Sequence, residues 1–187
     1  ILFPYDQAAA AIATALREQG LQAVLINTPL GNAAAGDRGL AGQPGREAEF
    51  EQALDRAIDV ARTIDCPRIH LMSGVGSLSE GLEQRRPVLL RNLRHAARRL
   101  APHGLAGLVE PINGRDIPGY LVRTQAQAHG LVQELGEPNL AVQMDLYHCQ
   151  VVEGDVATKI RQYLPTGRIG HFQVAGVPAR HEPDLGE

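Results

Sequence analysis

The sequence is poor in the residues that mark several common protein classes. Aromatic residues make up 4% of its 187 residues, and tryptophan is absent. The formal net charge is −3 at pH 7, so no basic excess is available to meet phosphates. Proteins that bind nucleic acids combine basic patches with aromatic rings that stack on bases. The composition therefore argues against a nucleic-acid partner.

Cysteines and long apolar runs are also scarce. Cys66 and Cys149 are isolated in the sequence, which argues against a zinc knuckle or a disulfide scaffold. We interpret them as reduced thiols of a cytoplasmic protein. No apolar run approaches the roughly 18 residues of a membrane span, so no membrane partner is expected. Hydrophobic residues make up 44% of the chain, enough for one folded domain with a sizeable core.

Short apolar runs alternate with helical patterns along the whole chain. The expected strands are Leu21–Ile26, Ile69–Met72, Leu105–Glu110, Leu140–Met144 and Ile169–Val174. The expected helices are Asp6–Glu18 with Asp6 as N-cap, Arg46–Thr63, Glu83–Leu100, Thr124–Leu135 with Thr124 as N-cap, and Asp155–Tyr163. This alternation predicts right-handed βαβ units and a parallel sheet. Because no G-x-G-x-x-G follows a strand, a dinucleotide-binding sheet has little support. The predicted fold class is α/β, a (β/α)8 TIM barrel.

The chain is expected to form one barrel domain, residues 1–187, that is incomplete at both ends. Ile1–Phe3 has the pattern of a strand already under way, and five full strands follow it. A closed barrel of this kind typically needs about 250 residues. We therefore expect roughly strands 2 to 7, with a first βα unit upstream and an eighth downstream.

Two further stretches call for interpretation. The Gly-rich connection Thr28–Gly45 is unusually long for a compact domain, and loops of this length are usually functional or mobile. Four arginines lie on one expected helix: Arg91, Arg94, Arg98 and Arg99. We interpret them as a solvated helix face and not as a binding patch.

Polar side chains follow three successive strands of the predicted sheet. Glu110 ends one apolar run, and Pro111 disfavours a helical continuation there. Asp145 and Gln173 stand at corresponding places, and Glu187 closes the loop after the last strand. Because strand ends converge at the mouth of a barrel, these oxygens are expected to meet. Carboxylate and amide oxygens suit Mg²⁺ or Mn²⁺ better than zinc. For any one of them alone, an ordinary polar strand end facing water is the alternative.

Histidines and an arginine are placed to reach the same mouth. His148 follows Asp145 by three residues, and His70 lies inside a strand where it can face inward. Arg180 and His181 lie in the loop that precedes Glu187, and arginine suits bidentate recognition of a carboxylate. A hydrogen-bonded core histidine and a solvent-exposed loop arginine are the alternatives.

Several stretches resemble hydroxypyruvate isomerases. They are L-V-E-P-I-N…D-I-P-G-Y (108–120), Q-M-D-L-Y-H-C-Q…E-G-D (143–155) and G-H-F-Q-V-A…P-A-R-H-E-P…G-E (170–187). L-F-P-Y-D (2–6) and P-G-R-E (44–47) match the same family, so the resemblance runs over essentially the whole chain. This family belongs to the xylose-isomerase-like TIM barrels, with 2-oxo-tetronate isomerases as close relatives.

The resemblance implies an intramolecular isomerase. Such an enzyme interconverts hydroxypyruvate and 2-hydroxy-3-oxopropanoate by proton transfer through a metal-stabilised enediolate. It implies Glu110 and Glu187 as proton donor and acceptor. It also implies a divalent metal, Mg²⁺ or Mn²⁺, without an organic cofactor. The implied metal ligands are Glu110, Asp145, Gln173 and Glu187. More distant sugar epimerases carry a histidine where Gln173 stands, which favours the isomerase branch.

The substrate of such an enzyme would be a small 2-oxo or hydroxy acid. We expect Arg180 to hold its carboxylate. Further substrate-binding candidates are His148, His181 and His70. The V-A-G-V-P run (174–178) is closer to the tetronate branch, whereas E-P-I-N and D-I-P-G are closer to the hydroxypyruvate branch.

Other functions stay open as alternatives. One is a 2-oxo-tetronate isomerase or related ketose epimerase, and another is a non-catalytic barrel that binds sugar acids. Phosphodiester cleavage at abasic DNA sites occurs on the same barrel, but the net charge of −3 and the amide of Gln173 argue against it. The oligomeric state is open too, with a homo-oligomer as one alternative.

Overall fold

The strands of the sheet follow the order of the chain. The computed structural model describes residues 2–76 and 82–183. Its parallel strands are β1 (Ile26–Asn27), β2 (Arg68–His70), β3 (Ala106–Val109), β4 (Leu140–Asp145) and β5 (Ile169–Gln173). They form one sheet in the order β1-β2-β3-β4-β5, whereas a doubly wound sheet reverses its order at a switch point. The prediction of parallel strands in a barrel-type α/β fold is confirmed.

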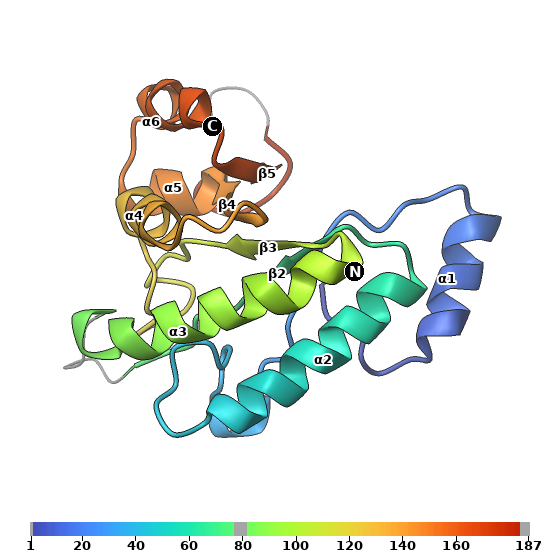
Figure 1. Ribbon diagram of the computed structural model, residues 1–187. Coiled ribbons are helices and arrows are strands. Elements are labelled where there is room, and N and C mark those ends of the chain that lie inside the picture. The colour runs from blue at the N-terminus through green and yellow to red at the C-terminus, as the bar shows by residue number, and fades with distance from the viewer. Residues whose placement is uncertain (1, 77–81, 184–187) are drawn as a thin grey trace.

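Helices connect the strands and cover one face of the sheet. They are α1 (Ala9–Glu18), α2 (Glu47–Thr63), α3 (Leu82–Leu100), α4 (Gln125–Leu135), α5 (Leu146–Val152) and α6 (Val156–Tyr163). Figure 1 shows α2 and α3 running alongside each other on the same side of the sheet. The sheet with its outer helices forms an arc of a barrel.

The apolar periodicity of the long helices accounts for their packing. On α2, Phe50, Leu54 and Ile58 recur every four residues and are buried against the sheet. On α3, Leu89 and Leu93 do the same. Side chains four residues apart share one helix face, so each helix presents one apolar stripe to the strands. This is the hydrophobic core that supports the strand ends.

The first helix begins later than predicted. Asp6 is not its N-cap, because α1 starts at Ala9 and Ala8 holds the cap position without a side-chain hydrogen bond. The reason is a tertiary contact. The Tyr5 hydroxyl donates to the Asn27 carbonyl at 2.5 Å, which keeps the preceding segment in a turn against β1. Thr124, in contrast, caps α4 as predicted, in a reciprocal capping box with Gln127.

The predicted strand tail at the start of the chain is only partly supported. Ile1 lies outside the described residues, and Leu2 and Phe3 do not form a strand. The Leu2 carbonyl nevertheless accepts a hydrogen bond from the Asn27 N–H at 2.9 Å. This segment therefore runs beside the end of β1, joined to it among the described residues by one backbone hydrogen bond.

The long connection Thr28–Gly45 is an ordered loop held by backbone hydrogen bonds. Its Ala41 and Gly42 N–H groups donate to the carbonyls of Met72 and Ser73, at 3.2 and 2.9 Å. Gly39 has a φ of 113°, and a Cβ there would lie 2.4 Å from the Met72 carbonyl oxygen. Only glycine tolerates both that conformation and that approach. The loop is thus fixed against the end of β2.

The arginines of α3 are paired with carboxylates. Arg91 lies within ion-pair distance of Glu47, Arg99 of Glu51 and Asp55, and both Arg94 and Arg98 of Glu137. Exposed pairs of this kind contribute little stability each. They do remove a free basic patch, as the sequence predicts. In the described part of the chain, no helix has the length and apolarity needed to cross a membrane.

Candidate active site

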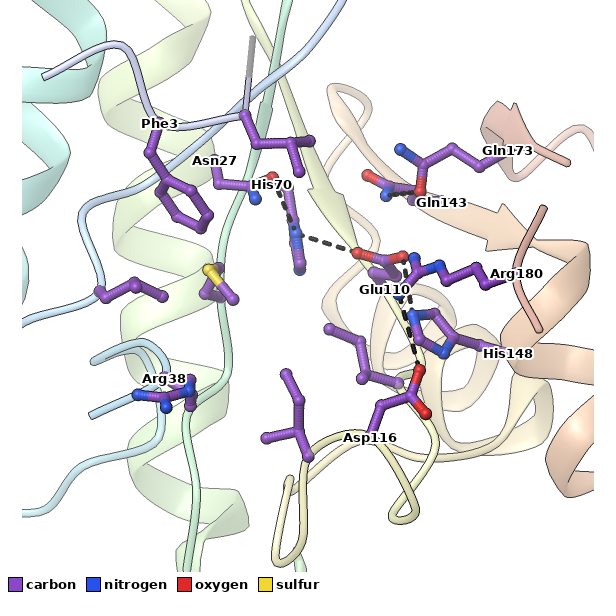
Figure 2. Close-up of a pocket in the computed structure, with 15 residues that line it drawn as sticks. Phe3, Asn27, Arg38, His70, Glu110, Asp116, Gln143, His148, Gln173 and Arg180 are labelled. Atoms are coloured by element: carbon purple, nitrogen blue, oxygen red, sulfur yellow. Dashed lines mark hydrogen bonds and ion pairs between the residues drawn. The ribbon is translucent and has the colours of Figure 1, made fainter. Parts of the chain in front are cut away.

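A cavity of about 270 Å³ opens at the C-terminal ends of the strands. Its polar wall carries Glu110, Gln143, Gln173, His148 and Arg180, and Figure 2 shows these side chains pointing toward one another. Strand register explains part of this grouping, because Asp145 on β4 is paired with Gln173 on β5. Ligands of parallel α/β barrels bind at this end.

Three oxygen-bearing side chains meet at one point of this wall. Glu110 and Asp145 are only 5% and 2% exposed. The terminal amide group of Gln173 places one atom 3.2 Å from Glu110 Oε1 and 3.2 Å from Asp145 Oδ2. The predicted meeting of Glu110, Asp145 and Gln173 is therefore seen in the structure.

The Gln173 amide can take either of two orientations, and each gives the site a different chemistry. With its oxygen toward the carboxylates, it accepts from Gln143 Nε2 at 2.8 Å, and three oxygens then face one another. Neighbouring oxygens in an octahedral Mg²⁺ site lie about 3 Å apart, so this arrangement fits a cation. With its nitrogen toward the carboxylates, Gln173 donates to both of them instead.

The Glu110 carboxyl is held in an environment that disfavours its charge. Burial first, and then the neighbouring Asp145 carboxylate, raise the pKa of Glu110 to about 8. Arg180 and a hydrogen bond from Gln143 act in the opposite direction. Titratable groups with pKa values near neutrality are suited to proton transfer.

The two oxygens of the Asp145 carboxylate have different partners. Its Oδ1 accepts the backbone N–H groups of Tyr147 at 2.9 Å and His148 at 3.3 Å, which caps α5. Its Oδ2 lies beside the Gln173 amide and accepts from Arg180 Nη2 at 3.1 Å. Helix α5 was not predicted from the sequence, and it places His148 over the mouth.

The ring orientation of His148 follows from Asn113. The Oδ1 atom of Asn113 accepts the backbone N–H groups of Arg115 at 3.0 Å and Asp116 at 2.8 Å. Its Nδ2 therefore donates to His148 Nδ1 at 2.7 Å. The His148 proton must then reside on Nε2, which lies 3.9 Å from Glu110 Oε1. Burial lowers the pKa of His148 to about 4, so the ring is neutral and presents an N–H donor to the cavity.

His70 contacts the other oxygen of Glu110. Its Nδ1 lies 3.2 Å from Asn27 Oδ1 and 3.1 Å from Glu110 Oε2, between two oxygens. That nitrogen is therefore the donor, and Nε2 keeps a lone pair without a partner among the described residues. Burial, and then the nearby His148, lower the pKa of His70 to about 3, so the ring is neutral. That lone pair is enclosed, because His70 Nε2 has almost no exposed surface.

Arg180 is anchored by two carboxylates and a ring. Its guanidinium lies 3.1 Å from Asp145 Oδ2 and 3.6 Å from Asp116 Oδ2. It also stacks over the Tyr147 ring, with 4.8 Å from Cζ to the ring centroid. The backbone of Arg180 adopts a φ of 60°, uncommon for a residue with a side chain.

The structure brings together most of the predicted site residues. Glu110, Asp145, Gln173, His70, His148 and Arg180 all lie at this one mouth. His181 does not line the cavity: it is exposed, and its carbonyl accepts from the Gly176 N–H. Glu187 lies outside the described residues.

Four contributing residues were missed from sequence. Gln143 is separated from Asp145 by one residue on β4, so strand alternation alone could have placed it on the same face. Asn113, Asp116 and Tyr147 act through contacts that depend on the fold of the loop after β3, and no spacing in the sequence reveals them.

The site can hold a metal ion. Ligand atoms of Glu110, Asp145 and His148 all lie within 4.8 Å of one another. Among the described residues, no other group of three His, Cys, Asp or Glu side chains has ligand atoms this close together. The donor set, together with the Gln173 amide, is rich in oxygen and suits a hard divalent cation.

Comparisons with known proteins agree with this reading of the fold. The sequence profile described as Xylose isomerase-like TIM barrel matches residues 1–187. A 2-oxo-tetronate isomerase of Cupriavidus necator is 47% identical over 186 residues, which cover 100% of this chain and 71% of the relative. The hydroxypyruvate isomerase of Escherichia coli is 38% identical over 186 residues, with the same shares covered, 100% and 71%.

A solved structure supports the same assignment. The crystal structure from Brucella melitensis described as an AP endonuclease of family 2 has a TM-score of 0.94 and 45% sequence identity. The match covers 100% of this chain and 71% of that chain. With a matching profile over its whole length and two curated isomerases among its relatives, the chain belongs to the xylose isomerase-like TIM barrel family.

Proposed function

We propose that the protein interconverts hydroxypyruvate and 2-hydroxy-3-oxopropanoate, as an aldose–ketose-type isomerase. The observation that carries the proposal is the buried Glu110 carboxyl, which lines the cavity with His70 Nδ1 at 3.1 Å from one oxygen and His148 Nε2 at 3.9 Å from the other. The names of the curated relatives support the reaction class. Substrate and product have the same oxidation state, so no organic redox cofactor is required.

The chemistry sets what the residues must do. One hydrogen leaves C3 of hydroxypyruvate as a proton, an enediolate forms, and a proton is added at C2. Over the same reaction the C2 oxygen gains a proton and the C3 hydroxyl loses one. The site must therefore exchange protons at both carbon and oxygen.

The described residues offer groups for part of this work, and the resemblance supplies one more. Glu110 takes the proton from carbon, and the resemblance assigns the second acid–base role to Glu187. His148 Nε2–H donates to the oxygen that gains negative charge. His70 is fully buried and its Nδ1 lies 3.1 Å from Glu110 Oε2, so it holds the orientation of that carboxyl. A donor aimed at a developing oxyanion contributes about 10²–10³ in rate.

We further propose that Glu110, Asp145 and Gln173 hold the divalent cation, Mg²⁺ or Mn²⁺, together with Glu187. When bound, such a cation supplies Lewis-acid polarisation of the carbonyl and stabilises negative charge. His148 is a poorer ligand than its position suggests, because Asn113 occupies Nδ1 and leaves the proton on Nε2. Gln143 serves by holding the Gln173 oxygen toward the two carboxylates.

A 2-oxo-tetronate is the second substrate candidate, because the relative with 47% identity bears that name. The name of the Brucella structure also raises cleavage at abasic DNA sites. An oxygen-rich donor set, and the pairing of α3 arginines with carboxylates, argue against that activity. DNA therefore belongs in the test only as a negative substrate.

The test is a substrate panel followed by proton NMR. Hydroxypyruvate and 2-oxo-tetronates are each incubated with the protein, with Mn²⁺ added and with chelator added. We expect conversion of one or both acids, incorporation of solvent deuterium at carbon, and loss of turnover in Glu110→Gln. No conversion of either acid with any metal would overturn the proposal.

A further inference from the structure

Arg180 bridges two carboxylates that have different partners. One guanidinium nitrogen, Nη2, donates to Asp145 Oδ2 at 3.1 Å, and the other, Nη1, lies 3.6 Å from Asp116 Oδ2. Asp145 is 3% exposed at its side chain and Asp116 is 27% exposed. The buried carboxylate thus carries the shorter contact with the arginine.

The hydroxyl of Tyr147 fixes the direction of Asp116. Arg115 Nη2 donates to the Tyr147 oxygen at 2.9 Å. Because arginine is only a donor, the Tyr147 proton is left to point at Asp116 Oδ1, which lies 3.1 Å away. Asp116 Oδ2 then faces Arg180, whose guanidinium rests on the Tyr147 ring. Asp116 and Tyr147 form a seat for Arg180 beside the site.

A conflict arises at Asp145 Oδ2. That oxygen is the one that meets Gln173 and Glu110 in the proposed cation site, and it is also the oxygen held by Arg180. A divalent cation and a guanidinium repel each other and compete for the same oxygen. Asp145 has no second oxygen to offer, because Oδ1 caps α5.

We propose that Arg180 stands in for the cation at Asp145, and that cation binding displaces Arg180 from Asp145 while it keeps its seat on Asp116 and Tyr147. The inference rests on the proposed function, in that it takes the cation site as given. Once the cation neutralises Asp145, Arg180 has lost the closer of its two carboxylate partners, and part of its charge is available to a substrate anion. Cation binding therefore precedes and promotes substrate binding, and Asp116 and Tyr147 are positioning residues.

Calorimetric titration of the purified protein with Mn²⁺ alone tests the exchange. Arg180→Met removes the competitor, so Mn²⁺ should bind about tenfold more tightly. Asp116→Asn weakens the seat and leaves Arg180 on Asp145, so Mn²⁺ should bind about threefold more weakly. Tyr147→Phe keeps the ring but removes the hydroxyl, and should shift affinity as Asp116→Asn does, by less.

Arg38→Met is the matched control. Arg38 lines the same cavity, but its guanidinium donates only to the carbonyls of Ala33 and Asp37, and no carboxylate of the described residues lies within ion-pair distance. Its removal should leave Mn²⁺ affinity within about twofold, since general electrostatics alone changes. Arg180→Lys, which keeps the charge, should fall between wild type and Arg180→Met. Thermal melting of each variant verifies that it is folded.

The outcomes separate this inference from the proposed function. Equal Mn²⁺ affinity in wild type and Arg180→Met, or the same gain in Arg38→Met, would overturn the exchange even if isomerisation is observed. The opposite shifts of Arg180→Met and Asp116→Asn would support it even if neither acid is converted. Absence of Mn²⁺ binding in every protein overturns it outright.

Discussion

Replacing His148 by asparagine or by glutamine tests the roles of the two ring nitrogens separately. An asparagine amide reaches the place of Nδ1 and keeps the contact with Asn113. A glutamine amide reaches the place of Nε2 and keeps a donor toward the cavity. His148 Nε2 lies 3.9 and 3.8 Å from the nearest oxygens of Glu110 and Asp145, beyond hydrogen-bond distance, so its proton is available to a substrate.

The expected changes in kcat and in Mn²⁺ affinity follow from these contacts. Loss of one donor to a developing oxyanion costs about 3–4 kcal/mol, so His148→Asn should lower kcat about 10²–10³-fold. His148→Gln should stay within about tenfold of wild type, because the donor persists with looser aim. Mn²⁺ affinity should change by less than about threefold in both variants, since a ring protonated on Nε2 is not a metal ligand.

Steady-state kinetics with the accepted acid and Mn²⁺ titrations provide the two readouts. His129→Asn is the control, because His129 is a buried histidine on α4 that does not line the cavity, and its loss should leave kcat unchanged. If His148→Asn weakens Mn²⁺ binding about a hundredfold, His148 is a ligand and the tautomer argument is wrong. Equal kcat in the two variants would also refute it.

Three further predictions concern stability. The folded pKa of Glu110, about 8, lies above its unfolded value, so wild-type stability should fall as pH rises from about 4.5 to 8. In denaturant titrations with chelator present, Glu110→Gln should reduce this loss by roughly 2–4 kcal/mol. An unchanged pH dependence of the unfolding free energy contradicts this. Gly39→Ala should cost about 2–3 kcal/mol, against about 1 kcal/mol for Gly45→Ala, whose Cβ meets nothing within 4 Å; equal melting temperatures would refute the clash with Met72. Burial lowers the pKa of His129 to about 4, so the unfolded chain takes up this proton first as pH falls. His129→Phe should therefore reduce the loss of stability between pH 6.5 and 4 by roughly 1–2 kcal/mol. An unaltered acid transition would speak against it.

The sequence predicts the strand ends well because their physics is local. An apolar run that stops at Glu110 or Asp145 specifies a buried strand and its mouth without reference to the rest of the chain. Gln173 follows from the same pattern. The apolar stripes of α2 and α3 are equally local, so both bounds of α2 and the end of α3 agree with prediction to within one residue.

The unpredicted parts depend on tertiary contacts. The 7-residue helix α5 is too short to show periodicity, and its cap is a carboxylate, Asp145, which the sequence assigns to another task. The start of α1 is displaced by a hydrogen bond from Tyr5 to β1. Asn113 decides the tautomer of His148 through a loop whose fold is set by its own side chain. Such couplings are invisible to composition and spacing.

The division of labour within the Asp145 carboxylate limits how this position can vary in evolution. An asparagine would keep the acceptor that caps α5 but lose the charge that meets Arg180. A library selected for protein abundance would therefore retain asparagine at this position, whereas one selected for turnover would reject it. A glutamate would keep the charge but displace the cap by one methylene. One side chain thus joins two selection pressures, and aspartate alone meets both.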